Sequence, residues 1–405
     1  MDNPSKAHFK IKKLAPSDLV QFNDLLRYAF QVTQKELLEI GWENDEIRKS
    51  KFPILQHANV LGYFDGDRLA SQISIYPMSM NIHSKKYDIG LITGVATYPE
   101  YACQGLMSSL MKVCLKEMRE KGQSISLLYP YSIPLYRKKG WELIADKMTF
   151  QVKDFQLPKP KKVTGYVRRV DENSQTLREL HDKFASKTHG CLVRNDLAWE
   201  EYWRWDSDDM TVAVYYTEKD EPTGYIVYRL DNEIFYIKEM VYLNREAWKG
   251  LWNYVSAHEP MLTEVRGNNY TGASISFWLA DSDIKETIRP YVMGRIIDVH
   301  AFIKDYQFNN VYRDDAITFE VKDDVCEWNN TSFTVKLSPN HPPVIENTPT
   351  EKLIQLDIRC LTTLLLGYKR PHYLNNMGML EADEQVLDLL EDMIPRARAY
   401  ISDYI

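Results

Sequence analysis

Residues 93–111 have the succession of strand, glycine-containing loop and helix that binds anions in many α/β proteins. The segment reads TGVATYPEYACQGLMSSLM. A strand ends, a loop containing Gly105 follows, and apolar residues at helical spacing begin at once. The first turn of a helix has unpaired backbone N–H groups and the positive end of the macrodipole, and a glycine lets the backbone approach a ligand closely. The segment therefore indicates a pyrophosphate site, although a strand, a glycine and a helix often follow each other for packing alone.

Other residues of chemical interest fit structural roles better. Cys103 lies in the same loop, but the sequence places no His or Asp beside it, so a small loop residue is a better interpretation than a nucleophile. The run Arg137-Lys138-Lys139 is typical of a solvated turn, with a minor contact to ligand phosphates as the alternative. Four histidines lack His, Cys or acidic neighbours at ligand spacing, so no metal site is expected. They are His83, His300, His341 and His372.

The composition excludes several classes of protein. The 405 residues predict more than one domain. Fifty Lys and Arg against 57 Asp and Glu give a net charge of −7, so nucleic acid is a poor default partner, whereas cationic small molecules would be attracted. No apolar run reaches the roughly 18–20 residues of a membrane helix, and no signal peptide is evident. The five cysteines form no C-x-x-C pair, and we expect a cytoplasmic protein with reduced thiols.

The elements that must position the anion-binding turn form a mixed α/β unit over residues 1–155. Helical spacing, turn dipeptides and apolar runs mark its parts. The predicted elements are a helix over 19–30, a hairpin at Asp65-Gly66, a strand over 87–99, a helix between Gly105 and Gly122, and a strand over 124–130.

A Pro- and Lys-rich stretch, residues 155–165, is typical of a linker and leads to a second section. This section repeats the element order of the first without repeating its residues, as a duplicated and diverged fold would. Its predicted elements are helices over 176–186, 198–205 and 247–258 and strands over 211–217, 224–230 and 233–243. One helix carries an aromatic cluster that is more typical of a core or subunit interface than of a substrate cage. Its members are Trp199, Tyr202, Trp203 and Trp205.

From about Tyr291 the pattern predicts a third, α+β domain that runs to the last residue. Residues 293–303, 316–321 and 332–337 alternate like strands, and 384–405 is predicted to be a final helix. That helix should pack on the third domain and carry Tyr404-Ile405 into the first domain. The residues of its apolar face are Leu387, Leu390, Ile394, Ala397 and Ile401.

The pattern V-x-T-x-P-E-Y-x-x-Q-G-L-x-x-x-L-M, from Val95 onward, resembles the coenzyme A loop of the GNAT acetyltransferases. Ala102 stands where that family usually has Arg or Gln, and Met107 where it often has Gly. The loop is more similar to that of one subfamily, the Eis-like (enhanced intracellular survival) N-acetyltransferases. Of that subfamily's loop pattern, Gly105-Leu106 is present in this sequence. Residues 127–143, LLYPYSIPLYRKKGWEL, resemble the segment in which Eis-like enzymes carry a catalytic tyrosine. The later sections resemble their second GNAT unit and their C-terminal domain, so the resemblance covers essentially the whole chain.

This resemblance implies roles for particular residues. Tyr136 would be the general acid, and the terminal carboxylate, which here belongs to Ile405, would be the base. Tyr131 and Ser132 would lie beside the thioester of acetyl-CoA. The strand edge that binds the pantetheine arm would be Val95, Ala96 and Thr97. The pyrophosphate loop would be Cys103, Gln104, Gly105, Leu106, Met107 and Ser108.

The resemblance implies a fold of two tandem GNAT-like domains, 1–155 and 156–287, followed by a sterol-carrier-protein-like α+β domain, 288–405. The implied activity is direct transfer of acetyl from acetyl-CoA to a cationic amine of the aminoglycoside, polyamine or lysine type. No metal, nucleic acid or membrane is involved, and the family resemblance suggests a homohexamer. Because no glycine loop precedes the helix at Ala247, no second coenzyme site is expected. The alternative is a lipid or small-molecule binding protein that uses the sterol-carrier-like domain and keeps a relic acetyltransferase site.

Overall fold

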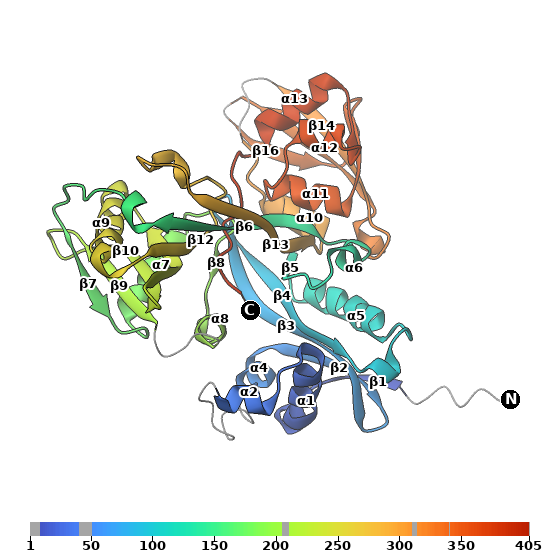
Figure 1. The fold of residues 1–405 in the computed structure, drawn as a ribbon. Helices are drawn as coiled ribbons and strands as arrows, with labels where there is room; N and C mark the ends of the chain where they lie inside the picture. The colour runs from blue at the N-terminus through green and yellow to red at the C-terminus, as the bar shows by residue number, and fades with distance from the viewer. Residues whose placement is uncertain (1–8, 40–50, 205–209, 310–313, 340, 405) are drawn as a thin grey trace.

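The computed structural model describes residues 9–39, 51–204, 210–309, 314–339 and 341–404. Within them the chain forms three sections, each of mixed helix and strand, which lie around a common centre (Figure 1). The mixed α/β character predicted from the sequence is confirmed. In the described ranges no helix is long and apolar enough to cross a membrane.

The elements follow one another in three groups. The first section contains β1 (Phe9–Lys13), α1 (Leu19–Phe30), α2 (Gln34–Glu39), α4 (Phe52–His57), β2 (Asn59–Asp65), β3 (Arg68–Ile82), β4 (Lys85–Thr97), α5 (Leu106–Glu120), β5 (Ile125–Leu128), α6 (Ile133–Arg137) and β6 (Glu142–Lys153). The second contains β7 (Tyr166–Val170), α7 (Gln175–Ala185), β8 (Leu192–Val193), α8 (Asp196–Trp203), β9 (Thr211–Tyr216), β10 (Pro222–Asp231), β11 (Ile234–Tyr242), α9 (Arg245–Ser256), β12 (Glu264–Asn269) and β13 (Lys285–Ile296). The third contains α10 (Val299–Asp305), β14 (Asp315–Lys322), β15 (Thr331–Ser338), β16 (His341–Glu346), β17 (Leu353–Asp357), α11 (Ile358–Leu365), α12 (Pro371–Asn376), β18 (Leu380–Glu381) and α13 (Glu384–Met393).

One large sheet joins the first two sections. Its strand order is β1-β2-β3-β4-β5-β13-β6-β12-β11-β10-β9-β7, and β8 pairs with β3. Strand β13 lies between β5 and β6, antiparallel to both, and it runs without a break across residue 288. A second sheet, β16-β15-β14-β17-β18, belongs to the third section, and α11 of that section packs on β6 and β13. The three sections are therefore held together by shared strands and helix packing rather than by linkers alone.

Helices α1 and α5 cover opposite faces of the first section's strands. On β4, Ile92 packs with the apolar side chains of α5, whereas Ile89 and Leu91 pack in the cluster that contains Phe22 and Leu25 of α1. This alternation follows from the period of two in a strand. Both faces of β4 are thus buried, and the strand is held rigidly up to the point where the chain leaves it.

Two predicted elements are wrong. The strand predicted over 293–303 ends at Ile296, and the following residues form α10, because the Asp298 side chain accepts a hydrogen bond from the Ala301 N–H and caps a helix there. The final helix predicted over 384–405 ends at Met393. Ile394 is extended because Pro395 follows it, and a residue before proline disfavours the helical conformation. Residues 394–404 run instead as an irregular tail to the middle of the molecule (Figure 1).

Candidate functional site

Strands β4 and β5 are paired at one end and separate at the other. They are parallel neighbours from Ile89 opposite Ile125 to Ile92 opposite Leu128, where β5 ends, while β4 continues to Thr97. Residues 93–97 therefore have no strand partner on their β5 side within the described chain. Their backbone N–H and C=O groups on that edge are open to a ligand. The edge includes Val95, Ala96 and Thr97, which the family resemblance assigns to the pantetheine arm.

A β-bulge distorts β4 at Gly94. On β3, Gln72 lies opposite Ala96 but Ser74 lies opposite Thr93, so β4 contains one extra residue between these pairs. Gly94 has φ of +60°, a left-handed conformation that glycine adopts without a steric cost. A bulge breaks the hydrogen-bond ladder and turns peptide groups out of it. The backbone beside Val95 is thus available to a substrate carbonyl.

The loop after β4 leaves the N-terminus of α5 uncapped. Cys103 and Gly105 have φ of +60° and +80°, and Gly105 is the N-cap residue, with no side chain capping the helix. A Cβ at Gly105 would meet nothing within 4 Å, so the space in front of the helix is open. The N–H groups of Leu106, Met107 and Ser108 precede the first intrahelical bond, from the Ser109 N–H to the Gly105 carbonyl. These N–H groups and the positive end of the helix dipole lie where the sequence predicts an anion site, and that site stays a prediction.

Contacts to the β2–β3 hairpin hold this loop in place. The Tyr101 hydroxyl donates to Asp65, and Arg68 forms an ion pair of 2.6 Å with Glu100. The Gln104 side chain donates to the Glu100 carbonyl. Of the loop side chains, Leu106 is buried in the core and contributes only its backbone to the open side. Cys103 is exposed, while the other four cysteines are buried thiols.

Tyr131, Ser132 and Tyr136 follow the end of β5. Tyr131 is 96% exposed, and the Ser132 carbonyl accepts the hydrogen bond from the Tyr136 N–H that opens α6. The Tyr136 ring is buried against apolar side chains of α5 and lies edge-on to Trp141. Its hydroxyl makes no hydrogen bond to another described residue. The hydroxyl oxygen is not fully enclosed, since it is not one of the described buried side-chain atoms that lack a partner. Burial raises the pKa of Tyr136 above the ordinary tyrosine value, so its hydroxyl, like that of any ordinary tyrosine, is protonated at neutral pH.

The C-terminal tail reaches the same place. The hydroxyls of Tyr129 and Tyr291 both donate to the Asp403 carbonyl, the second at 2.9 Å. The Tyr404 ring lies 5.1 Å from that of Tyr129, which immediately follows β5 and precedes Tyr131 by two residues. The predicted approach of Tyr404 to the first domain is therefore present, although a tail and not a helix brings it there. Ile405, the predicted base, lies outside the described residues.

A buried ion-pair network fixes this tail to the second section. Arg194 Nε lies 2.6 Å from Asp403 Oδ1, and Arg194 Nη2 lies 3.0 Å from Glu239 Oε1. All three side chains are at most 1% exposed, and the Ser402 hydroxyl donates to Glu239 as well. Burial raises the pKa of Glu239, but the Arg194 charge and the hydrogen bonds outweigh it and lower the pKa to about 2. Sequence reasoning missed this network, because its members are far apart in the chain and no local pattern links them.

The aromatic cluster of α8 packs around the same cation. The Arg194 guanidinium lies 4.7 Å from the ring centre of Trp199 and 4.0 Å from that of Tyr202. Trp203 packs edge-on against Tyr202. Trp205 lies outside the described residues. For the described members the favoured core interpretation is confirmed, since the cation they surround belongs to the chain itself.

The second section repeats the separating strand pair but closes the helix start. Residues 234–237 of β11 pair in parallel with 264–267 of β12, and α9 follows β11. Here the Asn244 side chain accepts the Ala247 N–H at 2.8 Å, and Glu246 places a carboxylate in the first turn. A capped helix start with a negative charge does not suit a pyrophosphate.

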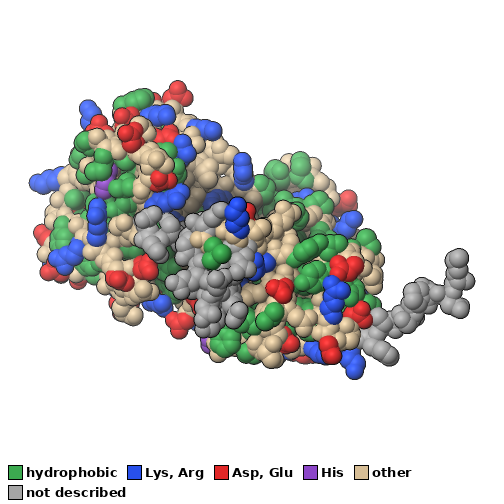
Figure 2. Space-filling view, turned by 60° about the horizontal axis from the view of Figure 1, so that its bottom comes forward, with side chains coloured by type: hydrophobic (Ala, Val, Ile, Leu, Met, Phe, Trp, Pro, Cys, Tyr) green, Lys and Arg blue, Asp and Glu red, His purple; other side chains and the backbone are tan. Residues whose placement is uncertain are grey.

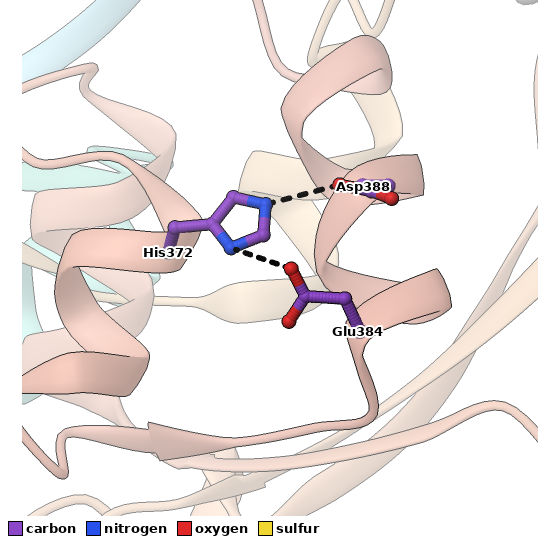
Figure 3. Close-up of side chains that lie close together, drawn as sticks. All are labelled: His372, Glu384 and Asp388. Carbon is purple, nitrogen blue, oxygen red and sulfur yellow. Dashed lines mark hydrogen bonds and ion pairs between the residues drawn. The ribbon is translucent and has the colours of Figure 1, made fainter.

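His372 has acidic neighbours in the fold that its sequence position does not reveal. Its Nε2 lies 3.1 Å from Asp388 and its Nδ1 lies 3.7 Å from Glu384, one turn earlier on α13 (Figure 3). Both carboxylates belong to α13, so the sequence around His372 shows no acidic neighbour at ligand spacing, and only the fold brings them beside it. One ring nitrogen and one oxygen of each carboxylate lie within 4.8 Å of one another, a spacing that could hold a metal ion, although exposed acidic groups often lie close together without one. The expected lack of a metal site therefore stays a prediction.

Comparison with known proteins identifies the families of the three sections. Residues 10–144 match the family model for an acetyltransferase (GNAT) domain, and residues 190–296 match a second model of the same description. This chain is a GNAT acyltransferase. Residues 299–402 match the sterol carrier protein domain. The predicted fold class, two GNAT-like domains followed by a sterol-carrier-like domain, is confirmed.

Relatives and solved structures extend over the whole chain. An uncharacterized N-acetyltransferase of Streptomyces griseus is 19% identical over 404 residues, which cover 92% of this chain and 93% of the relative. The crystal structure of a probable N-acyltransferase of Enterococcus faecalis has a TM-score of 0.88 at 23% identity and covers 98% of this chain and 100% of that one. Eis1 of Mycobacterium abscessus has a TM-score of 0.80 at 15% identity, with the same coverage. These structures show a shared fold, which confirms the Eis-like resemblance at that level.

The first GNAT domain fits the acyl donor that the family uses, acetyl-CoA. An open strand edge, at residues 95–97, leads directly to the uncapped N-terminus of α5 and the open space at Gly105. The extended pantetheine arm of the coenzyme, with its amide groups, needs the open strand edge, and the pyrophosphate needs the uncapped helix N-terminus. The second GNAT domain offers a separating strand pair but a capped helix.

Proposed function

We propose that the protein transfers an acetyl group from acetyl-CoA to the nitrogen of a cationic amine, with aminoglycosides, polyamines and lysine side chains as the candidate classes. The observation that carries the proposal is the meeting of the open β4 edge and the uncapped α5 start in the first domain. A net charge of −7 favours a cationic acceptor. On the face shown in Figure 2, acidic and basic side chains are interspersed, which gives nucleic acid no single basic patch there.

The binding roles follow from the backbone. Val95, Ala96 and Thr97 would hydrogen-bond the pantetheine arm along the open edge. The N–H groups of residues 106–108 would hold the pyrophosphate, with Cys103, Gln104 and Gly105 shaping the loop in front of them. Tyr131 and Ser132 would lie beside the reacting carbonyl. The strand edge at residues 95–97 has no strand partner on its β5 side, and the N–H groups of residues 106–108 have no intrahelical partner.

The catalytic roles combine one acid and one base. Bound acetyl-CoA supplies an activated thioester carbonyl. Backbone N–H groups at the Gly94 bulge would polarise this carbonyl, and the amine would attack it directly. Tyr136, which is protonated at neutral pH, would donate its proton to the departing thiolate. The base in this proposal is the α-carboxylate of Ile405. The Arg194 network holds the tail at Asp403, and Tyr404, the residue before Ile405, packs against Tyr129.

A thiol-release assay tests the proposal. Purified protein is mixed with acetyl-CoA and a panel of amines, and free CoA thiol is followed with a chromogenic thiol reagent. Because Cys103 is exposed and would itself react, a Cys103→Ser variant provides the matched background. Thiol release that depends on one of the amines supports the proposal. Tight binding of a fluorescent fatty acid with no thiol release would favour the lipid-binding alternative instead. The cytoplasmic location and the homohexamer remain parts of the proposal, and light scattering on the eluting protein measures the second.

A further inference from the structure

Ala102 stands where the GNAT loop usually has Arg or Gln, but a lysine from another element lies beside the loop. Lys139, two residues after the end of α6, places Nζ 2.9 Å from the Ser108 hydroxyl. Ser108 is the third residue of α5 and belongs to the uncapped first turn. A cation therefore lies beside the positive end of a helix dipole, where a positive charge is unfavourable without an anion. Within the described residues no carboxylate pairs with Lys139.

Lys139 differs in this respect from its two basic neighbours. The Arg137 guanidinium is engaged by both carboxylate oxygens of Glu142, at 2.7 to 3.0 Å, so its charge is compensated. Lys138 is exposed and forms no ion pair with a described residue. Of the run 137–139, only Lys139 is directed at the helix start.

A buried contact fixes the backbone that carries Lys139. The Lys139 carbonyl accepts a hydrogen bond of 2.7 Å from Arg295, a fully buried arginine of β13 that is paired at 2.5 Å with Asp323 of the third section. Gly140 makes room for this guanidinium, because a Cβ there would lie 1.4 Å from Arg295 Nη1. The backbone of Gly140 is also left-handed, with φ of +88°, which favours glycine. The lysine is thus placed in advance of binding, which reduces the entropy lost when a ligand binds.

We propose that Lys139 binds the pyrophosphate of the coenzyme, together with the N–H groups of residues 106–108, and so takes the place of the arginine missing from the loop. This inference rests on the proposed function. The pyrophosphate is the group that a helix N-terminus binds, and the ammonium lies at the third residue of that helix. A charge-assisted hydrogen bond at a partly exposed site corresponds to about a tenfold change in affinity.

Calorimetric titration of the purified full-length chain separates the possibilities. Lys139→Met should weaken the binding of coenzyme A and of dephospho-coenzyme A about tenfold each, while pantetheine, which lacks the pyrophosphate, should bind both proteins equally. Lys139→Arg should retain most of the affinity. Lys138→Met, next to it and exposed, is the matched control and should bind like the wild type. The affinity of wild type should also fall more steeply with salt than that of Lys139→Met.

Several results would overturn the inference. If the affinity of Lys139→Met for coenzyme A lies within twofold of that of the wild type, Lys139 has no specific role. The same conclusion follows if Lys138→Met binds coenzyme A as weakly as Lys139→Met does. A loss seen with coenzyme A but not with dephospho-coenzyme A would move Lys139 to the 3′-phosphate and refute the pyrophosphate assignment. If the wild type itself bound no coenzyme A, the proposed function would fail, and this inference with it. Circular dichroism melting of each variant verifies that the fold is retained.

Discussion

Replacement of Arg194 by methionine should destabilise the protein strongly, because this arginine is fully buried between two carboxylates. The variant leaves Glu239 and Asp403 buried without their cation, since each is about 1% exposed. The pKa of Glu239 is about 2, against an ordinary value of 4.5. The lowered pKa shows that the Arg194 charge and the hydrogen bonds outweigh the burial of this carboxylate, so loss of Arg194 leaves a buried charge uncompensated.

The expected size of the effect follows from the behaviour of buried ion pairs in general. Removal of one partner from a buried ion pair typically costs about 3–5 kcal/mol, because a charge is left uncompensated. The contacts of the guanidinium with the rings of Trp199 and Tyr202 are lost as well. The contribution of the ionised Glu239 to the stability of the fold is fully present above about pH 4.5 and is lost as the pH falls toward about 2. The stabilities of the variant and the wild type should therefore be compared at pH 7.

Urea denaturation followed by tryptophan fluorescence measures this effect. The matched control is Arg178→Met, since Arg178 pairs with Asp196, whose side chain is 99% exposed, and it also lies over Trp199. That control should lose less than about 1 kcal/mol. A triple variant, Arg194→Met with Glu239→Gln and Asp403→Asn, should recover part of the loss, because the buried charges are gone. If Arg194→Met and Arg178→Met unfold at the same urea concentration, the network does not stabilise the fold as argued.

Three further changes test the site and its surroundings. Tyr136→Phe should lower turnover by about 10²–10⁴ with little change in coenzyme affinity, and activity within a few-fold of wild type would remove it from the mechanism. A few residues appended after Ile405 should abolish transfer while acetyl-CoA binding measured by calorimetry stays intact, whereas normal turnover would exclude the terminal carboxylate as base. Burial lowers the pKa of His83 to about 3 and that of His189 to about 4, and their stacked rings join all three sections through the Leu365 and Leu366 carbonyls. Since the unfolded chain takes up protons that the folded state excludes, the melting temperature should fall as the pH drops from about 6.5 toward 4, and a flat profile would contradict this.

Local sequence patterns were sufficient for the part of the site that neighbouring residues build. The strand before Gly105, the helix after it and the hairpin at Asp65-Gly66 follow from periodicity and turn chemistry, and the structure has each of them. The end of the final helix was misread because an apolar period continues past Pro395, while proline chemistry ends the helix before it.

The contacts that complete the site join residues far apart in the chain. Arg194 meets Asp403, and Lys139 meets Ser108, across separations that no local pattern encodes. His372 gains its two carboxylates only when α12 and α13 pack together. A single sequence holds no periodic signal for such pairs, because they depend on the tertiary arrangement of rigid elements.

Transfer of labelled acetyl from acetyl-CoA, followed by mass spectrometry of both protein and amine, tests the central claim most directly. Acetyl-CoA carrying ¹³C in the acetyl group is incubated with the wild-type chain and the amine panel, and both fractions are examined before and after complete thiol release. The account predicts label on the nitrogen of one amine class, none covalently attached to the protein at any time, and loss of the transfer in Tyr136→Phe. Label that accumulates on Cys103 or on another protein side chain, or an amine fraction that stays unlabelled while acetyl-CoA is bound, would contradict it.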